Sequence, residues 1–194
     1  LRSVANSAFV FAGGIEQAYD LGQNAVAYIG GELSDQLALV ARLIKGGLDT
    51  RIFLVTLEGF DNHAEQGNNH PRLLRELGGS MKAFYDDLAA SGDDQRVITT
   101  TFSEFGRRIE QNASNGTDHG TAAPQLLFGP ALNGSGVHGD APDLTAPDNN
   151  GNLVFTTDFR SVYASLLEHW LCIPATEVNT VLGGNFPRLD LGFD

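Results

Sequence analysis

Basic residues are scarce in this sequence of 194 residues. Lys and Arg together number 12 against 24 Asp and Glu, which gives the chain a formal net charge of −12. Proteins that bind a nucleic-acid backbone need a cationic surface to displace its counterions, so the composition argues against a nucleic-acid partner. An acidic protein that acts on an anionic ester would need a metal ion to reverse the local field.

Cysteine and long apolar runs are also scarce. The single cysteine, Cys172, excludes an internal disulfide, and the apolar run around it, 170–173, predicts a small buried side chain. No stretch of about 20 apolar residues is present, the length that a membrane-spanning helix needs, so we expect no membrane span. The first residues hold neither a methionine nor a charged and apolar leader, so we expect any targeting peptide to have been removed or to lie outside this sequence.

The remaining composition is that of an ordinary globular protein, with 42% hydrophobic and 19% charged residues. A chain of this length can bury roughly 70% of the surface that its unfolded form exposes. We therefore expect residues 1–194 to form a single α/β domain.

Apolar residues at helical spacing predict four helices. The first, at 3–19, has a loose pattern that Gly13-Gly14 interrupts, and the second runs from residue 33 to a glycine pair at 46–47. The third begins at Pro71 and ends before Gly92. Thr157-Asp158 can cap the last, which extends to Trp170.

Three apolar or β-branched runs predict strands, at 50–57, 97–102 and 124–129. The first is a nearly continuous apolar run, which is typical of a strand buried on both faces. Because a predicted helix separates the first two strands, we expect a right-handed parallel βαβ unit. The expected fold is α/β, a mostly parallel sheet flanked by helices on both faces. Polar loops are expected at 103–123 and 131–152, with a plain turn rather than a calcium loop at 148–151.

Two His-Asp pairs follow predicted strands. Asp61 and His63 come after the strand at 50–57, and Asp118 and His119 lie in the loop before the strand at 124–129. Carboxylate oxygens and imidazole nitrogens from two loops are the donors that a divalent cation requires. The alternative for each pair is a local hydrogen bond without a metal.

Several motifs of known chemistry are absent. The segment around Ser103 reads F-S-E-F-G and lacks the G-x-S-x-G of a nucleophile elbow. The sequence also contains no phosphate-binding P-loop and no G-x-G-x-x-G dinucleotide fingerprint. Glu104 and Arg107 nevertheless lie beyond a strand end, where open α/β sheets bind their ligands.

Four motifs resemble, in this order, those of the bacterial domain of unknown function 1501 family. They are G-F-D-N-H-A-E-Q at 59–66, S-E-F-G-R at 103–107, G-T-D-H-G at 116–120 and T-D-F-R-S-V-Y-A at 157–164. The likeness covers most of the chain from about residue 33. That family is grouped with the sulfatases and alkaline phosphatases.

The resemblance implies an alkaline-phosphatase-like sheet and bound divalent metal, either zinc or calcium or manganese. In that superfamily an Asp and a His after one strand bind a metal together with a later His that precedes another strand. Asp61 and His63 match the first pair, and His119 matches the later His. The resemblance also implies a small anionic ester as substrate and a periplasmic or exported location.

The second metal of that superfamily takes an Asp-His-Gly at the end of the intervening strand. This sequence has Ser103-Glu104-Phe105-Gly106 there, so Glu replaces Asp and Phe replaces His. A competing alignment sets Asp118-His119 against the same signature. We favour the first, because the signature follows its strand at once, whereas Asp118 lies 16 residues beyond Phe102.

The first strand of that superfamily, with its Ser or Thr nucleophile, has no match in this sequence. We therefore expect the chain to be the C-terminal part of a larger alkaline-phosphatase-like domain. Three hypotheses follow: a metal-dependent phosphate or sulfate ester hydrolase, a non-catalytic exported binding or scaffold domain, and a surface-associated protein whose acidic loop binds calcium. In the first, the metal ligands are Asp61, His63, His119 and Asp118, with Glu104 as accessory ligand or acid/base group and Arg107 as anion clamp.

Overall fold

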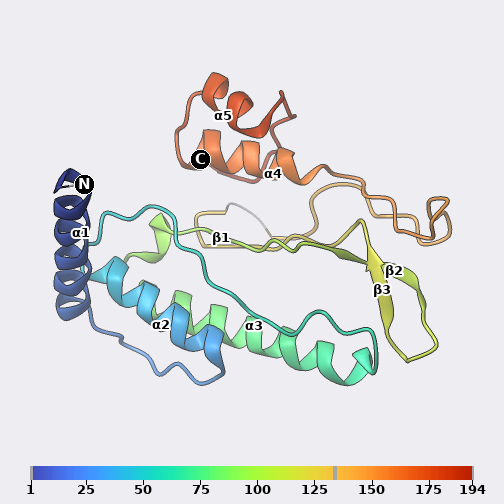
Figure 1. Cartoon of the computed structure of the whole chain (residues 1–194), viewed down its shortest axis with the longest axis horizontal. Coiled ribbons are helices and arrows are strands. Elements are labelled where there is room, and N and C mark those ends of the chain that lie inside the picture. Colours follow the sequence, from blue (N-terminus) through green and yellow to red (C-terminus); the bar gives the residue numbers. More distant parts are fainter. Residues whose placement is uncertain (1, 133–134, 194) are drawn as a thin grey trace. The chain divides into compact units, whose positions relative to one another are not determined.

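A computed structural model describes residues 2–132 and 135–193. By its internal contacts the chain divides into two compact units. The first consists of residues 1–62 and 67–97, and the second of residues 63–66 and 98–194 (Figure 1). None of the helices in the described part of the chain combines the length and the apolar character needed to cross a membrane.

The first unit is helical. Its elements are α1 (Arg2–Leu21), α2 (Glu32–Lys45), α3 (Gln66–Ala89) and the short 3₁₀ turn η1 (Asp94–Arg96). The core side chains recur at helical spacing, which confirms the amphipathic pattern predicted for α2 and α3. They are Leu33, Leu37, Ala41 and Ile44 on α2, and Leu73, Met81, Phe84 and Leu88 on α3.

The start of α3 differs from the prediction. The helix begins at Gln66, five residues before Pro71, so the proline lies inside it. A proline at the sixth position lies beyond the first turn, so it removes one intrahelical hydrogen bond, the one that an N–H there would donate to the carbonyl four residues earlier.

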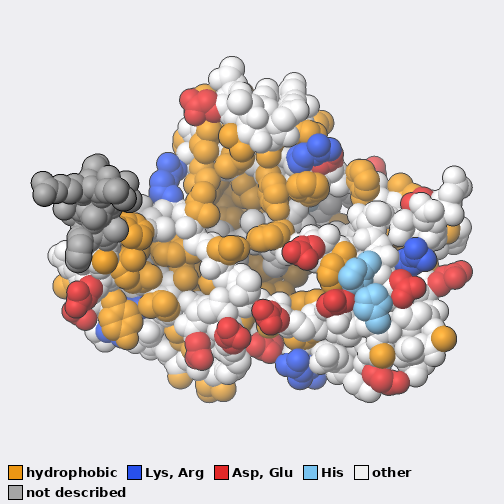
Figure 2. All heavy atoms as spheres, viewed as in Figure 1, with side chains coloured by type: hydrophobic (Ala, Val, Ile, Leu, Met, Phe, Trp, Pro, Cys, Tyr) orange, Lys and Arg blue, Asp and Glu red, His pale blue; other side chains and the backbone are white. Residues whose placement is uncertain are grey.

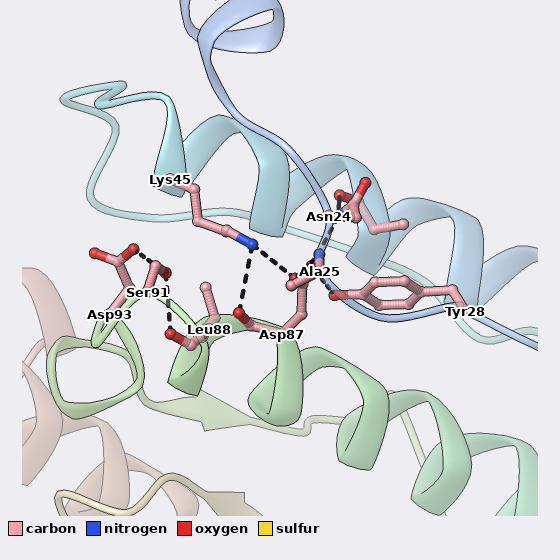
Figure 3. Close-up of polar contacts among 9 residues, drawn as sticks. Asn24, Ala25, Tyr28, Lys45, Asp87, Leu88, Ser91 and Asp93 are labelled. Atoms are coloured by element: carbon pink, nitrogen blue, oxygen red, sulfur yellow. Dashed lines mark hydrogen bonds and ion pairs between the residues drawn. The ribbon is translucent and has the colours of Figure 1, made fainter.

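A buried carboxylate ties the helices of this unit together (Figure 3). Asp87 on α3 is fully buried and accepts hydrogen bonds from Asn24 Nδ2 at 2.8 Å, Ala25 N at 2.6 Å and Tyr28 Oη at 3.0 Å. Lys45 at the end of α2 lies 2.7 Å away and forms an ion pair with it. Desolvation raises the pKa of Asp87, but the bonds from Asn24 and Lys45 outweigh it and hold the pKa below its ordinary value.

The strand predicted at 50–57 is not formed, and that prediction is wrong. The segment is extended but pairs with no other strand of the described chain, and Ile52 and Leu54 are 70% and 72% exposed. The side-chain amide of Gln36 takes the place of a neighbouring strand at one residue only. It donates to the Thr56 carbonyl at 3.0 Å and accepts from the Thr56 N–H at 2.9 Å.

The second unit contains two small antiparallel sheets, which contradicts the predicted mostly parallel sheet. Strand β1 (Thr99–Thr100) pairs with β4 (Leu127–Phe128), and β2 (Gly106–Gln111) pairs with β3 (Thr117–Gly120). The loop predicted at 103–123 is therefore mostly a hairpin. A short turn can only return the chain antiparallel, whereas a parallel pair needs a long crossover, so the described residues contain no parallel βαβ unit.

Helices follow in the last part of the second unit. The predicted cap of α4 (Phe159–Ser165) is confirmed, since Asp158 accepts from the Arg160 N–H at 2.9 Å. The chain continues through the π-helical turn η2 (Leu166–Trp170) into α5 (Ala175–Leu182), which the sequence pattern did not predict. Cys172 is exposed, which corrects its predicted burial. It lies just past η2 with a positive φ of 55°, and this turn carries its side chain to the surface.

The segment between β4 and α4 has no helix or strand in its described residues, as predicted. The predicted turn at 148–151 is confirmed. Asp148 Oδ1 accepts from the N–H groups of Asn150 and Asn152, both at 2.8 Å, which closes the turn.

Candidate metal centre

The short segment 63–66 is fastened to the turn of the β2–β3 hairpin. Backbone N–H groups of Glu65 and Gln66 donate to the carbonyls of Ser114 at 3.0 Å and Asn115 at 3.1 Å. The side chains repeat the pairing, because Asn115 Nδ2 donates to Glu65 Oε1 at 2.9 Å and Thr117 Oγ1 to Gln66 Oε1 at 2.8 Å. Four hydrogen bonds thus hold residues about 50 positions apart in the chain side by side.

Gly116 allows this close approach. The residue is buried, and a Cβ atom built on it would overlap the carbonyl group of His63. Only glycine lets the hairpin turn reach the backbone of His63 at this point.

The imidazole of His63 lies between two residues of β3. Its Nε2 is 3.1 Å from His119 Nε2, and its Nδ1 is 3.4 Å from Asp118 Oδ1. Asp61 stands two residues earlier in the chain, and one donor atom each from Asp61, His63 and His119 lie within 4.8 Å of one another. All three residues are exposed, and Figure 2 shows histidine side chains at the surface next to acidic ones.

The spacing of the two imidazoles suits a metal ion. Two nitrogens bound tetrahedrally at about 2.0–2.1 Å from zinc stand about 3.3 Å apart, close to the observed 3.1 Å. A carboxylate on Nδ1 of a ligating histidine fixes its tautomer and leaves Nε2 free to bind. Asp118 has that position on His63. Two imidazoles and one carboxylate suit zinc or manganese, whereas calcium prefers a shell of oxygens.

Stacking holds the second imidazole. The Phe105 ring lies parallel to that of His119, with centroids 3.7 Å apart and planes 7° from parallel. The guanidinium carbon of Arg107 is 5.1 Å from the centroid of the Phe105 ring. Arg107 also donates from Nη1 to the Thr117 carbonyl at 2.5 Å, so it supports the hairpin beneath the stack.

Asp118 is kept ionised. The hydrogen bond from Asn112 is the largest of the influences that lower the pKa of this carboxyl, and the bond from His63 is the second. The nearby charge of Arg108 lowers it further. An ionised carboxylate is the form that can only accept, so it suits a hydrogen bond donated by His63 Nδ1.

The structure brings together three of the six residues that the sequence singled out, Asp61, His63 and His119. Asp118 contacts the outer nitrogen of His63 and is not among the three donors. Glu104 is exposed and lies outside that group.

The sequence interpretation missed three supporting residues of the centre, Phe105, Asn112 and Gly116. Asn112 and Gly116 could have been recognised as parts of a turn, because an Asn followed by a glycine-containing turn is typical of a hairpin connection. The sequence placed Phe105 where the resemblance implies a histidine, but nothing in the pattern indicated that its ring would stack on His119.

Comparison with known proteins identifies one relationship. A family model described as a protein of unknown function (DUF1501) matches residues 16–184. The match includes every residue of the centre described above. No curated protein and no solved structure matches the chain.

Proposed function

The chain belongs to the DUF1501 family, and we propose that it is a metal-dependent hydrolase in which Asp61, His63 and His119 hold one divalent cation. The observation that carries the proposal is the pair of Nε2 atoms 3.1 Å apart, with the Asp61 carboxylate in the same group. Asp118 would orient His63 from outside the ligand shell.

Three protein ligands leave a coordination position for water or substrate. Catalytic zinc sites have this composition, whereas structural sites close the shell with a fourth protein ligand. The exposure of all three residues leaves that position accessible. A cation bound there would polarise an ester oxygen and lower the pKa of a bound water.

The sequence motifs support a phosphate or sulfate ester as the substrate class, through the grouping of the family with sulfatases and alkaline phosphatases. The net charge of −12 adds to this argument, since the chain needs a cation wherever it binds an anion. In this proposal Glu104 is the acid or base group and Arg107 the anion clamp. Their alanine variants should lower turnover while the metal stays bound.

One observation favours the alternative, an exported binding or scaffold domain without catalysis. Phe105 stands where the resemblance implies a histidine of a second metal site, and its ring stacks on His119. The described residues contain a single group of three metal-binding side chains. One cation can serve binding as well as catalysis, so activity has to be measured separately from metal content.

The test begins with the metal. Purified protein should bind one zinc or manganese ion, and Asp61→Ala, His63→Ala and His119→Ala should each weaken the affinity by at least 10-fold. His138→Ala is the matched control, an exposed histidine outside the group. Absence of bound metal, with unchanged affinity in the three variants, would overturn the proposal.

Activity separates the two functions. Hydrolysis of aryl phosphate and aryl sulfate esters by the metal-loaded protein, lost in His119→Ala, supports the hydrolase. A tightly bound metal with no hydrolysis of either ester supports the binding domain. Export is common to both proposals and can be checked by fractionating cells that produce the protein.

A further inference from the structure

We infer that Asn112 is a positioning residue of the metal centre, and that it holds His63 and Asp118 in place through one side-chain amide. Asn112 directly follows β2, where the hairpin turns. Its Nδ2 donates to the His63 carbonyl at 2.9 Å and to Asp118 Oδ1 at 3.2 Å. Its Oδ1 accepts from the backbone N–H groups of Ser114 and Gly116, both at 3.0 Å.

These four contacts fix the orientation of the amide. A carbonyl and an ionised carboxylate can only accept, so the atom that faces them must be the NH₂ group. Two backbone N–H groups can only donate, so the atom that faces them must be the oxygen. Reversing the amide would break all four bonds, which leaves Asn112 one orientation.

His63 needs this support because its own bond to the carboxylate is long. His63 Nδ1 and Asp118 Oδ1 are 3.4 Å apart, and the two side chains are 51% and 52% exposed. An exposed pair at that distance does not hold its geometry alone, since solvent competes and side-chain entropy opposes order. Asn112 restrains the carboxylate directly and the imidazole through the backbone of its residue.

The role of Asn112 in metal binding rests on the proposed function, because the position of His63 matters only if His63 binds a metal. The contacts of Asn112 do not depend on that function, however, so they can be tested with metal-free protein. The expected consequence is that His63 has one neutral tautomer, with the proton on Nδ1 facing Asp118.

Two variants separate the positioning of His63 and Asp118 from the second role of Asn112, which is to close the hairpin turn. Asn112→Asp keeps the oxygen that Ser114 and Gly116 require but replaces the donor by a second carboxylate facing Asp118. Asn112→Ala removes both functions. Gln111→Ala is the control, since Gln111 Nε2 bonds Asn115 Oδ1 at 3.0 Å in the same turn and is not among the contacts of His63 or Asp118.

The experiment measures the His63 tautomer by nitrogen-15 NMR of the imidazoles, in metal-free protein at about pH 8, where an ordinary imidazole is neutral. Wild type and Gln111→Ala should show the Nδ1-protonated form, and both Asn112 variants a mixture of tautomers. In parallel, the zinc Kd should rise about 10- to 100-fold in both Asn112 variants and less than about twofold in Gln111→Ala. In Asn112→Asp this loss should occur although the added charge alone would attract the cation.

Two results would overturn the inference. One is a His63 tautomer in folded Asn112→Ala and Asn112→Asp that equals the wild type, and the other is an equal rise of Kd in Gln111→Ala. If wild type binds no zinc, the proposed function fails, and the tautomer comparison alone decides the role of Asn112.

Discussion

A histidine binds a metal through one ring nitrogen, and the partner of the other nitrogen decides which one is available. The imidazoles of His63 and His119 are held by different contacts. His63 has a carboxylate on Nδ1, whereas the His119 ring is stacked against Phe105. The first arrangement, supported by Asn112, sets both the tautomer and the tilt of the ring, and the second sets the plane of the ring only.

This difference predicts unequal effects of removing the two supports. Asp118→Ala should raise the Kd for zinc about 10- to 100-fold, as is typical when the hydrogen-bond partner of a ligating histidine is lost. Phe105→Ala should have a smaller effect, because His119 keeps its place in β3. Competition with a chromophoric chelator measures both, with Glu110→Ala, an exposed acid on the same hairpin, as the control. A larger loss in Glu110→Ala than in Asp118→Ala would show that net charge, and not orientation, sets the affinity.

Gly116 should tolerate no side chain. Its Cβ would overlap the His63 carbonyl, so Gly116→Ala should push residues 63–66 away from the hairpin. We expect a loss of about 1–3 kcal/mol in the free energy of unfolding and at least a 10-fold weaker metal affinity. Denaturant titration and metal titration measure the two effects. Gly78→Ala in α3 is the control, where a Cβ meets nothing within 4 Å, and it should be neutral or slightly stabilising.

At the scale of elements, the first four helices and the positions of β1 and β4 were predictable, whereas α5, the β2–β3 hairpin and the antiparallel pairing were not. The apolar spacing of α2 and α3 indicates both the helix and the buried face, because a helix satisfies its own backbone. A strand needs a partner that its own sequence does not specify. The run at 50–57 has the composition of a buried strand but meets only the Gln36 amide. The segment 106–111 has a single apolar residue, Ile109, and still forms the longest strand.

The centre shows the same limit. The sequence interpretation brought Asp61, His63 and His119 together by placing them at one end of a parallel sheet. They do lie together, but the cause is the hairpin turn that binds residues 63–66. Donor types can be recognised from the sequence, whereas the hydrogen bonds of Asn112 and the close approach at Gly116 depend on a turn geometry that the sequence pattern does not show.

The buried Asp87 should contribute strongly to the stability of the first unit. Asp87→Ala leaves the Lys45 ammonium, 11% exposed, without its carboxylate, and removes the bonds of Asn24 and Tyr28. Breaking one side of such a pair typically costs about 3–5 kcal/mol. Urea titration should show this loss, while Asp86→Ala, which removes an exposed i,i+4 pair with Lys82, should change stability by less than about 0.5 kcal/mol. An equal loss of stability in Asp87→Ala and Asp86→Ala would contradict the stabilising role of the buried Asp87.

The same carboxylate predicts an acid dependence. Its pKa in the folded protein is lower than in the unfolded chain, so its stabilisation is fully present above the unfolded value of about 3.9 and is lost as the pH falls through the folded value. The urea concentration at the midpoint of unfolding of the wild type should therefore decrease as the pH is lowered below about 4. Asp87→Asn should show a weaker dependence in this range, and a dependence equal to that of wild type would assign the effect to other carboxylates.

For the molecule as a whole, the residues that orient the two imidazoles lie in one compact unit. His63, Asn112, Asp118 and His119 all belong to the second unit, although the chain on either side of 63–66 belongs to the first. The contacts that orient the two imidazoles are therefore made within the second unit. The geometry of the centre should follow the hairpin.

The exposed apolar segment has a consequence for the behaviour of the chain in solution. Ile52 and Leu54 are 70% and 72% exposed on a segment that pairs with no strand of the described residues, and exposed apolar side chains there favour association with another chain. Leu54→Lys should reduce concentration-dependent association in sedimentation velocity. The free energy of unfolding should change by less than about 0.5 kcal/mol, since the side chain is mostly in water.

Val181→Lys distinguishes this effect from a general gain of charge. Val181 is 76% exposed but lies on α5, where the backbone bonds are satisfied within the helix. Val181→Lys should therefore change association less than Leu54→Lys, although the two variants have the same net charge. If both reduced association equally, the acidic surface as a whole would govern it. If only Leu54→Lys did, the exposed apolar side chains of 50–57 would form the contact, because neither an exposed valine on a helix nor net charge alone would account for the difference.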